Sequence, residues 1–241
     1  MIKAVALDID GTITNENGVI PPEAWKAIKE LEENSVRVIL CSGNAACVLL
    51  GLRRYSGATG GIVAENGGVV VCNGEERVLS EDTEILREAR SVLLKELRGI
   101  IVESLQNRYR RVDYAFKLVN ESLSRQEVVK RMRKVLLRHG FENLEVLDSG
   151  VAFHVHVKGV SKAEGLRVVA SCMGIGLNEV AAIGDSETDI PMFSIAGLNI
   201  AVGNAVNELK RVAHIVLEEE YYKGFLKAVQ IILSCNKLEL K

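Results

Sequence analysis

Two aspartates, Asp8 and Asp10, follow a short apolar run at residues 2–7. The run is almost wholly apolar, which predicts a strand that is buried on both faces. The two carboxylates would then lie at the end of a buried strand, where they repel each other and lose hydration. Gly11 comes next and permits a sharp turn. Such a pair needs a positive partner, and its oxygen ligands favour a hard divalent cation, most simply Mg²⁺.

A second acidic pair, Asp185 and Asp189, follows the predicted strand at residues 179–183. A spacing of four residues predicts that both side chains share one face of a helix, so that they converge on one cation. Asp185 would stand at a strand end, on the same level as Asp8.

Ser42, Gly43 and Asn44 follow another predicted strand, residues 36–41. A helix opening at residues 21–23 separates this strand from the first, and strand, helix and strand of this length predict a parallel sheet. Ligands bind outside the carboxyl ends of such strands. The Ser42 hydroxyl and the amides of Gly43 and Asn44 suit phosphate oxygens. Alternatively, Ser42 caps the helix that follows.

Lys162 lies in the first turn of a predicted helix, where Ser161 and Glu164 have the spacing of a capping box. A cation in this position opposes the helix dipole, and a functional role would explain it. The alternatives are that Lys162 is a solvated surface lysine, or that Lys158 takes the functional role.

The composition excludes several classes of protein. The chain has 241 residues, is 48% hydrophobic and has a net charge of −2, so a substantial core is expected and a nucleic-acid surface is not. The five cysteines are odd in number and contain no Cys-x-x-Cys pair, which indicates neither a disulfide framework nor a zinc site; most are expected to be small core residues. No signal peptide or membrane span is indicated, so a reducing cytoplasmic location is the default expectation.

Residues 80–157 have a different order of predicted helices and strands from the residues before them. Helical patterns at 81–97 and 124–138 alternate with strand-like pairs at 100–105 and 113–119, and at 144–147 and 151–157. This order predicts a small antiparallel sheet with helices on one face, inserted into the parallel domain as a mobile cap. Before it, residues 69–79 predict a hairpin, which the cap or another subunit would cover.

Residues 151–157 alternate strictly, so that Ala152, His154 and His156 face one way and the apolar residues face the other. We expect the apolar set to lie under the cap helices and both histidines to face the cleft, where they would help to define a substrate pocket. A metal site made from the two histidines is conceivable, but no third ligand stands out.

The motif Asp8-Ile-Asp10-Gly-Thr resembles the first motif of the haloacid dehalogenase-like (HAD) phosphohydrolases. Ser42, Lys162 and the Gly-Asp185 to Asp189 stretch match the second, third and fourth motifs in order. The resemblance covers essentially the whole chain and implies a Rossmann-like parallel-sheet core, residues 1–79 and 158–241, with an inserted type 2 α+β cap, residues 80–157. Asn44 departs from the arginine of many large-cap relatives, and Thr188 departs from their asparagine.

The resemblance also implies roles. Asp8 attacks phosphorus to form an aspartyl-phosphate, and Asp10 transfers the proton. Ser42, Gly43, Asn44 and Lys162 bind the phosphoryl group, with Lys162 also steadying the nucleophile. A magnesium ion is held by Asp8, the carbonyl of Asp10, Asp185 and Asp189.

The short chain, its cap and Ser-Gly-Asn at the second motif further resemble archaeal phosphoglycolate phosphatases. This implies 2-phosphoglycolate as the substrate, a small phosphorylated metabolite, in a monomer or homodimer. Among the cap cations Arg108, Arg110, Arg111 and Lys117, one would bind the carboxylate, although a surface charge run also explains the arginines. The alternatives are a sugar-phosphate or phosphoglycerate-type phosphatase, a phosphomutase, and a catalytically silent phosphate-binding module.

Overall fold

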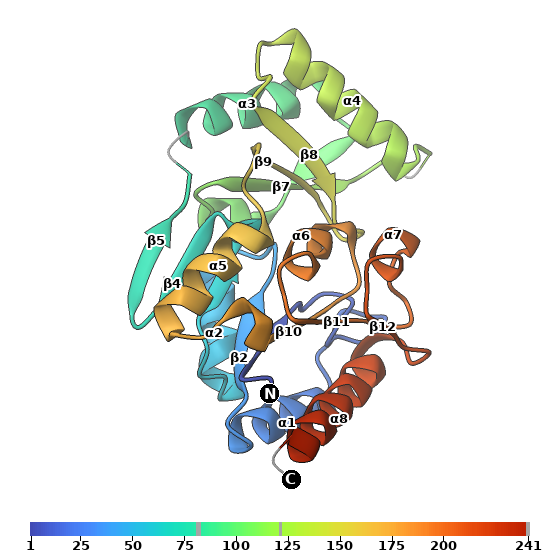
Figure 1. The fold of residues 1–241 in the computed structure, drawn as a ribbon. Coiled ribbons are helices and arrows are strands. Elements are labelled where there is room, and N and C mark those ends of the chain that lie inside the picture. The colour runs from blue at the N-terminus through green and yellow to red at the C-terminus, as the bar shows by residue number, and fades with distance from the viewer. Residues whose placement is uncertain (81–82, 121, 240–241) are drawn as a thin grey trace.

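The computed structural model describes residues 1–80, 83–120 and 122–239, and it contains two separate sheets (Figure 1). The larger sheet has eight strands in the order β12-β11-β10-β1-β2-β3-β4-β5, and the smaller has four in the order β6-β7-β9-β8. Figure 1 shows the smaller sheet above the larger one, on the side where the central strands end.

The larger sheet is parallel from β12 to β3 and ends in an antiparallel hairpin. Three central strands are almost entirely buried, as their apolar runs predict. The strands are β1 (Ala4–Leu7), β2 (Arg37–Cys41), β3 (Ile62–Ala64), β4 (Val69–Cys72), β5 (Glu75–Val78), β10 (Val180–Gly184), β11 (Leu198–Ala201) and β12 (Ile215–Val216).

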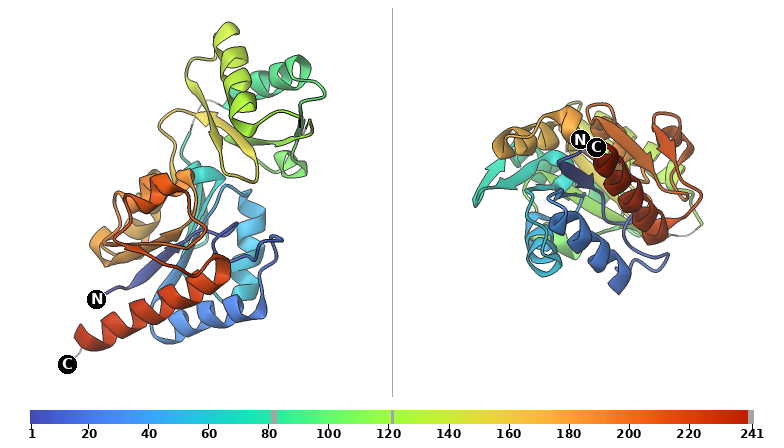
Figure 2. Two further views of the ribbon diagram at one scale, coloured as in Figure 1. Left: turned by 90° about the vertical axis from the view of Figure 1, so that its right-hand side faces the viewer. Right: turned by 60° about the horizontal axis from the view of Figure 1, so that its bottom comes forward.

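Helices cover both faces of this sheet, because successive side chains of a strand point to opposite faces. Val5 and Leu7 of β1 pack into one apolar cluster, and Ala4 and Ala6 pack into the other. The first cluster includes residues of α1 (Pro22–Glu33), α2 (Ala46–Ser56) and α8 (Tyr221–Glu239). The second includes residues of α5 (Lys162–Met173), α6 (Ile190–Phe193) and α7 (Asn207–Lys210). Figure 2 shows these layers from two further sides.

The smaller sheet is antiparallel throughout, and its two long helices contact it. Tyr114, Phe116 and Phe153 are buried in the same cluster as Leu86 of α3 and Met132 of α4. The elements are α3 (Thr83–Glu96), β6 (Ile101–Glu103), β7 (Asp113–Leu118), α4 (Arg125–Arg138), β8 (Leu144–Asp148) and β9 (Phe153–Val157), with a 3-10 turn at Leu105–Arg108. The predicted fold class, a parallel α/β core with an antiparallel α+β cap, is confirmed.

Some details differ from expectation. The strand predicted at 100–105 ends at Glu103, and the chain then forms the 3-10 turn. Residues 81 and 82, the predicted start of α3, lie outside the described residues, and the domain boundaries at 79 and 157 stay predictions. The helix predicted at 124–138 is confirmed as α4, and the Ser124 side chain caps it by accepting from the Glu127 amide. In the described part of the chain, no helix is long and apolar enough to cross a membrane.

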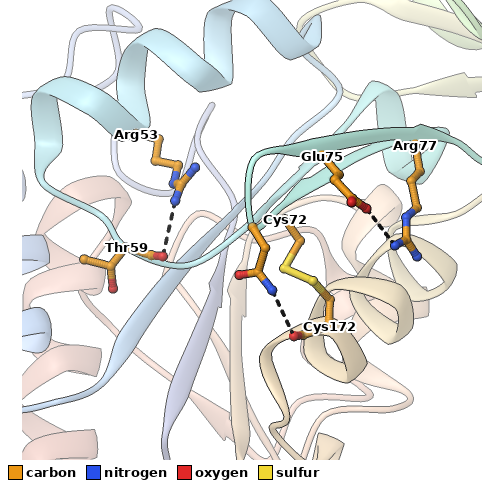
Figure 3. The surroundings of a disulfide bond; sticks show 7 residues. Arg53, Thr59, Cys72, Glu75, Arg77 and Cys172 are labelled. Atoms are coloured by element: carbon orange, nitrogen blue, oxygen red, sulfur yellow. Dashed lines mark hydrogen bonds and ion pairs between the residues drawn. A yellow bond between two sulfur atoms is a disulfide. The ribbon is translucent and has the colours of Figure 1, made fainter.

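The structure contains a disulfide, which the cysteine pattern did not indicate. Cys72, at the end of β4, is bonded to Cys172, near the end of α5, with 6.5 Å between their Cα atoms (Figure 3). The two residues are 100 apart in sequence, so spacing rules for local motifs gave no signal of the pair. The bond attaches the hairpin of β4 and β5 to the helix that begins with Lys162.

The expectation that most cysteines are core residues is also wrong. Cys41 is buried, whereas Cys47 and Cys235 are exposed. The disulfide also removes the cysteine pattern as an argument for a reducing compartment, and a cytoplasmic location stays a prediction.

Candidate active site

Three carboxylates meet at the carboxyl edge of the larger sheet. Asp8 follows β1, Asp185 follows β10, and Asp189 lies in the next turn; one oxygen of each lies within 4.8 Å of the others. Among the described residues, this is the group of side chains that could hold a metal ion. It is a hard, all-oxygen donor set of the kind that Mg²⁺ prefers.

Asp185 and Asp189 converge, but not on a helical face as predicted. Residues Glu187–Asp189 form a single 3-10 turn, and α6 begins only at Ile190. The Asp189 carboxylate folds back instead, and its Oδ2 accepts from the amides of Asp185 (3.1 Å) and Ser186 (2.9 Å). The turn is therefore held by the same carboxylate that it positions.

Lys162 is the cation nearest to this cluster. Its Nζ donates to Asp8 Oδ1 and to Asp189 Oδ1, at 2.6 Å each, and the residue is 2% exposed. It is therefore not the solvated lysine of the alternative reading, while Lys158 is exposed. The predicted capping box is wrong, because Ser161 makes no capping hydrogen bond through its side chain.

The start of α5 is fixed by close packing instead of a cap. Gly67, at φ +105°, approaches so closely that a Cβ there would lie 1.9 Å from the carbonyl oxygen of Ser161. No side chain fits between these two backbones, so the loop after β3 sets the position from which Lys162 reaches Asp8.

Burial and mutual repulsion disturb the carboxylates. Burial raises the pKa of Asp8 to about 7, although Lys162 opposes the change. Burial, together with the charges of Asp8 and Asp189, raises the pKa of Asp185 to about 9. Burial lowers the pKa of Lys162, but the carboxylates of Asp189 and Asp8 outweigh it and raise the pKa. One ammonium group does not balance three carboxylates, which fits a site for a divalent cation.

Thr12 is a site residue that the sequence reasoning did not single out. Its Oγ1 lies 3.0 Å from Asp8 Oδ2 and 3.0 Å from Asp185 Oδ1, so it bridges two of the acids. Gly11 makes this approach possible, since a Cβ there would lie 2.2 Å from Asp185 Oδ2. The sequence feature that could have identified Thr12 is the Asp-Gly-Thr motif, in which the threonine follows the turn glycine.

Asp10 points to a different partner. Its Oδ2 accepts from Asn44 Nδ2 at 2.6 Å, and the same amide nitrogen lies 3.0 Å from Ser42 Oγ. Ser42 is buried, and α2 begins after Ala45 without any side-chain cap, so the alternative reading of Ser42 as a helix cap is wrong. Asn44, the departure from the usual arginine, is thus the residue that holds Asp10.

The cap reaches this group through Gln106, which the sequence reasoning missed. Gln106 Nε2 donates to Asn44 Oδ1 at 2.8 Å, and the Ala45 amide donates to Gln106 Oε1 at 3.0 Å. Gln106 sits in the 3-10 turn after β6, where no periodic pattern marks it.

A cavity of about 250 Å³ lies between the two sheets. On the core side it is lined by Asp8, Asp10, Ser42, Gly43, Asn44 and Lys162, and on the cap side by residues that include Gln106, Arg110, Lys117 and His154. Asp185 and Asp189 are not among the residues that line this cavity. The cavity therefore joins the predicted nucleophile and phosphate-binding residues in one space with the cap.

The two histidines have different surroundings. His154 lines the cavity, and its Nδ1 lies 2.9 Å from Asp113 Oδ2. His156 is fully buried outside the cavity lining, so the prediction that both histidines face the cleft is wrong for His156. Neither belongs to the metal-capable group of the described residues. In the sheet His154 is paired with Ala115, which lines the cavity, whereas His156 is paired with Asp113, which does not.

The cap arginines also differ in whether they line the cavity. Arg110 and Lys117 line the cavity. Arg108 and Arg111 do not; the Arg111 side chain is 59% exposed and pairs with Glu76 at 3.0 Å. The surface-charge explanation therefore holds for Arg111 and not for Arg110, whose side chain is 3% exposed.

Comparison with known proteins gives a consistent result. A family model described as haloacid dehalogenase-like hydrolase matches residues 5–110 and 94–229. Curated proteins named phosphoglycolate phosphatase align over nearly their whole length. The protein of Methanothermobacter thermautotrophicus is 36% identical over 95% of this chain and 98% of its own, and that of Metallosphaera sedula is 37% identical over 97% and 100%.

Comparison with solved structures identifies proteins of the same fold. A protein of Thermoplasma acidophilum superposes with a TM-score of 0.82 at 25% identity, covering 95% of this chain and 97% of its own. A haloacid dehalogenase-like hydrolase from Bacteroides thetaiotaomicron has the same fold, with a TM-score of 0.77 at 20% identity over 96% of this chain and 100% of its own. This chain belongs to the haloacid dehalogenase-like hydrolase family.

Proposed function

We propose that this protein is a Mg²⁺-dependent phosphatase that hydrolyses 2-phosphoglycolate to glycolate and inorganic phosphate. The observation that carries the chemistry is the position of Asp8: its carboxylate lines the cavity, contacts Lys162 at 2.6 Å, and lies against two further carboxylates. A buried nucleophile with one cation and two further carboxylates close to it suits attack on an anionic ester.

Asp8, the backbone carbonyl of Asp10 and Asp185 would hold the magnesium ion, with Asp189 adding its charge and fixing the turn. Bound Mg²⁺ would supply the positive charge that keeps Asp8 ionised and neutralises phosphoryl oxygens. Asp189 has a supporting place in this proposal because its Oδ1 accepts from Lys162 and its Oδ2 from two backbone amides.

The reaction then proceeds in two displacements. A carboxylate oxygen of Asp8 bonds to phosphorus while the bond from phosphorus to the ester oxygen breaks, and Asp10 gives its proton to that oxygen. In the second step Asp10 takes a proton from water, which attacks phosphorus, frees phosphate and restores Asp8. Lys162, Ser42 and the amide of Gly43 hold the phosphoryl oxygens, while the Asn44 amide donates to Ser42 Oγ at 3.1 Å.

The substrate proposal rests on two supports. The curated relatives that align from end to end carry the name phosphoglycolate phosphatase. In addition, a cavity of about 250 Å³ is small, below the roughly 300–1,000 Å³ of pockets that hold drug-sized ligands, and so favours a short ester.

The test is phosphate release from a panel of 2-phosphoglycolate, phosphoglycerates, sugar phosphates and nucleotides, with Mg²⁺ or with a chelator. We expect Mg²⁺-dependent release that is highest for 2-phosphoglycolate. Asp8→Asn should lower it by about a thousandfold or more, because the nucleophile is lost.

Other results would change the proposal in defined ways. Faster release from another ester would keep the chemistry and replace the substrate. Return of the phosphoryl group to a second position of the substrate, without free phosphate, would indicate a phosphomutase. No turnover of any ester by folded protein with Mg²⁺ would contradict the proposal as a whole.

A further inference from the structure

The cap side of the cavity is positively charged. Among the described cap residues that line it, Arg110 and Lys117 are cations and none is a carboxylate. On β7, Asp113, Ala115 and Lys117 share one face because they are two residues apart. On this face Ala115 lies between Asp113 and Lys117, and its small side chain also lines the cavity.

Arg110 is buried without a full set of partners. Its Nη1 donates to the carbonyl oxygen of Asp113 at 3.2 Å, and its Nη2 lies 3.5 Å from Gln106 Oε1. Its Nε is buried and has no hydrogen-bond partner. A buried guanidinium with unsatisfied donors is costly, so its position at the cavity calls for an anion as its partner.

The nearest carboxylate, that of Asp113, does not supply this partner. Asp113 Oδ1 is 3.8 Å from Arg110 Nη1, longer than the hydrogen-bonded distance of a paired arginine and carboxylate. Its Oδ2 accepts from Asn66 at 2.6 Å and lies 2.9 Å from His154 Nδ1. The charge of Asp113 is thus shared with His154, and the charge of Arg110 is only partly offset.

We propose that Arg110, assisted by Lys117, binds the carboxylate of the leaving group, so that the enzyme selects phosphate esters of short hydroxy acids. This inference rests on the proposed function and names the substrate class that the same site takes. Arg110 binds the carboxylate at the cap side while the phosphate oxygens are held at the core side by Ser42 and Lys162. The small cavity keeps the two anionic groups of the substrate close together.

The test compares kcat/KM for 2-phosphoglycolate and for ethyl phosphate, which has a methyl group in place of the carboxylate. Wild type should prefer 2-phosphoglycolate by about 100-fold, the size expected when a charged hydrogen-bonding group is lost from a ligand. Arg110→Met should lose about 30- to 100-fold on 2-phosphoglycolate and change less than about threefold on ethyl phosphate.

Further variants locate the effect. Arg110→Lys should recover part of the activity on 2-phosphoglycolate, because the charge stays while the forked donor geometry is lost. Lys117→Met should lose about tenfold on that ester, since this lysine is exposed and more screened. Arg111→Met is the matched control, an exposed neighbour outside the cavity lining, and should leave both rates unchanged.

Different experimental results would contradict this inference and the proposed function. An equal loss on both esters in Arg110→Met, with or without a lower unfolding temperature, would overturn the carboxylate subsite and leave a structural role. A wild-type enzyme that ignores 2-phosphoglycolate but hydrolyses a phosphoglycerate, with the same dependence on Arg110, would discard the proposed substrate and support the subsite. Preference for a sugar bisphosphate, lost in Arg110→Met, would assign the anion to a second phosphate and overturn the carboxylate.

Discussion

Two buried charged clusters face each other across the cavity, and their charge balance is opposite. At the edge of the core sheet, Asp8, Asp185 and Asp189 share one cation, Lys162. In the cap, a single carboxylate, Asp113, is surrounded by Arg110 and His154. The core cluster has an excess of carboxylates, and the cap cluster has an excess of groups that carry or can accept positive charge.

The pKa values of the buried carboxyl groups are therefore shifted in opposite directions in the two clusters. Burial raises the pKa of Asp8 to about 7 and that of Asp185 to about 9. Burial also acts to raise the pKa of Asp113, but the charges of His154 and Arg110 overcome it and lower the pKa to about 2. The number of partners, not depth alone, decides which form of a buried acid is stable. The core cluster needs a cation and the cap cluster an anion, which in our proposals are the magnesium ion and the carboxylate of the substrate.

The largest expected effect concerns the single cation of the core. Lys162→Met should lower the free energy of unfolding by about 3–5 kcal/mol at neutral pH without Mg²⁺, because it leaves buried carboxylates uncompensated. Urea unfolding measures this, with Lys158→Met as an exposed control that should change less than about 0.5 kcal/mol. A loss below 1 kcal/mol would mean that the core carboxylates are protonated or hydrated and would remove the contrast between the clusters.

The next effect is the response of the core cluster to Mg²⁺. At a hundred times its dissociation constant, Mg²⁺ should add about 2.7 kcal/mol to the free energy of unfolding, and Asp185→Asn should remove most of that gain. Thermal unfolding with and without the ion tests this. Glu187→Gln, exposed in the same turn, is the matched control and should respond like wild type. An undiminished response in Asp185→Asn would place the ion elsewhere.

The pH dependence of the cap cluster follows from Asp113. Its pKa is about 2 in the folded protein against 3.8 for an unperturbed aspartate, so its ionised form stabilises the fold. This contribution, about 2 kcal/mol, is fully present well above pH 4, falls to roughly half near pH 3, and is lost as the pH passes through 2. The difference in unfolding free energy between wild type and Asp113→Asn should shrink over this range in urea titrations. A difference independent of pH would show that Asp113 acts through packing alone.

The smallest effect tests the link between the clusters. Gln106→Ala should lower kcat for 2-phosphoglycolate about tenfold, because Gln106 holds Asn44 and Asn44 holds Asp10, the proposed proton donor. For p-nitrophenyl phosphate, whose leaving group needs no proton, the change should stay below about threefold. The control is Gln126→Ala on the exposed face of α4. An equal loss on both esters would assign Gln106 to cap docking and not to the proton transfer.

Much of the fold and part of the site follow from local sequence. The apolar runs before Asp8 and Asp185 predict buried parallel strands, and strand direction then brings the residues at their ends to one edge of the sheet. The alternating strands and amphipathic helices of residues 80–157 predict the cap in the same way. These inferences succeed because strand periodicity and chain order are properties of short segments.

Only the tertiary structure decided the rest. It separated Arg110 from Arg111, which are adjacent in a charged run but lie buried at the cavity and exposed on the surface. It separated His154 from His156, brought Gln106 to Asn44, and paired Cys72 with Cys172 across 100 residues. The physical reason is common to all of these cases. Burial, partners and charge balance depend on segments that are distant in sequence, so local patterns identify the residues able to do chemistry and packing decides which of them face the cavity.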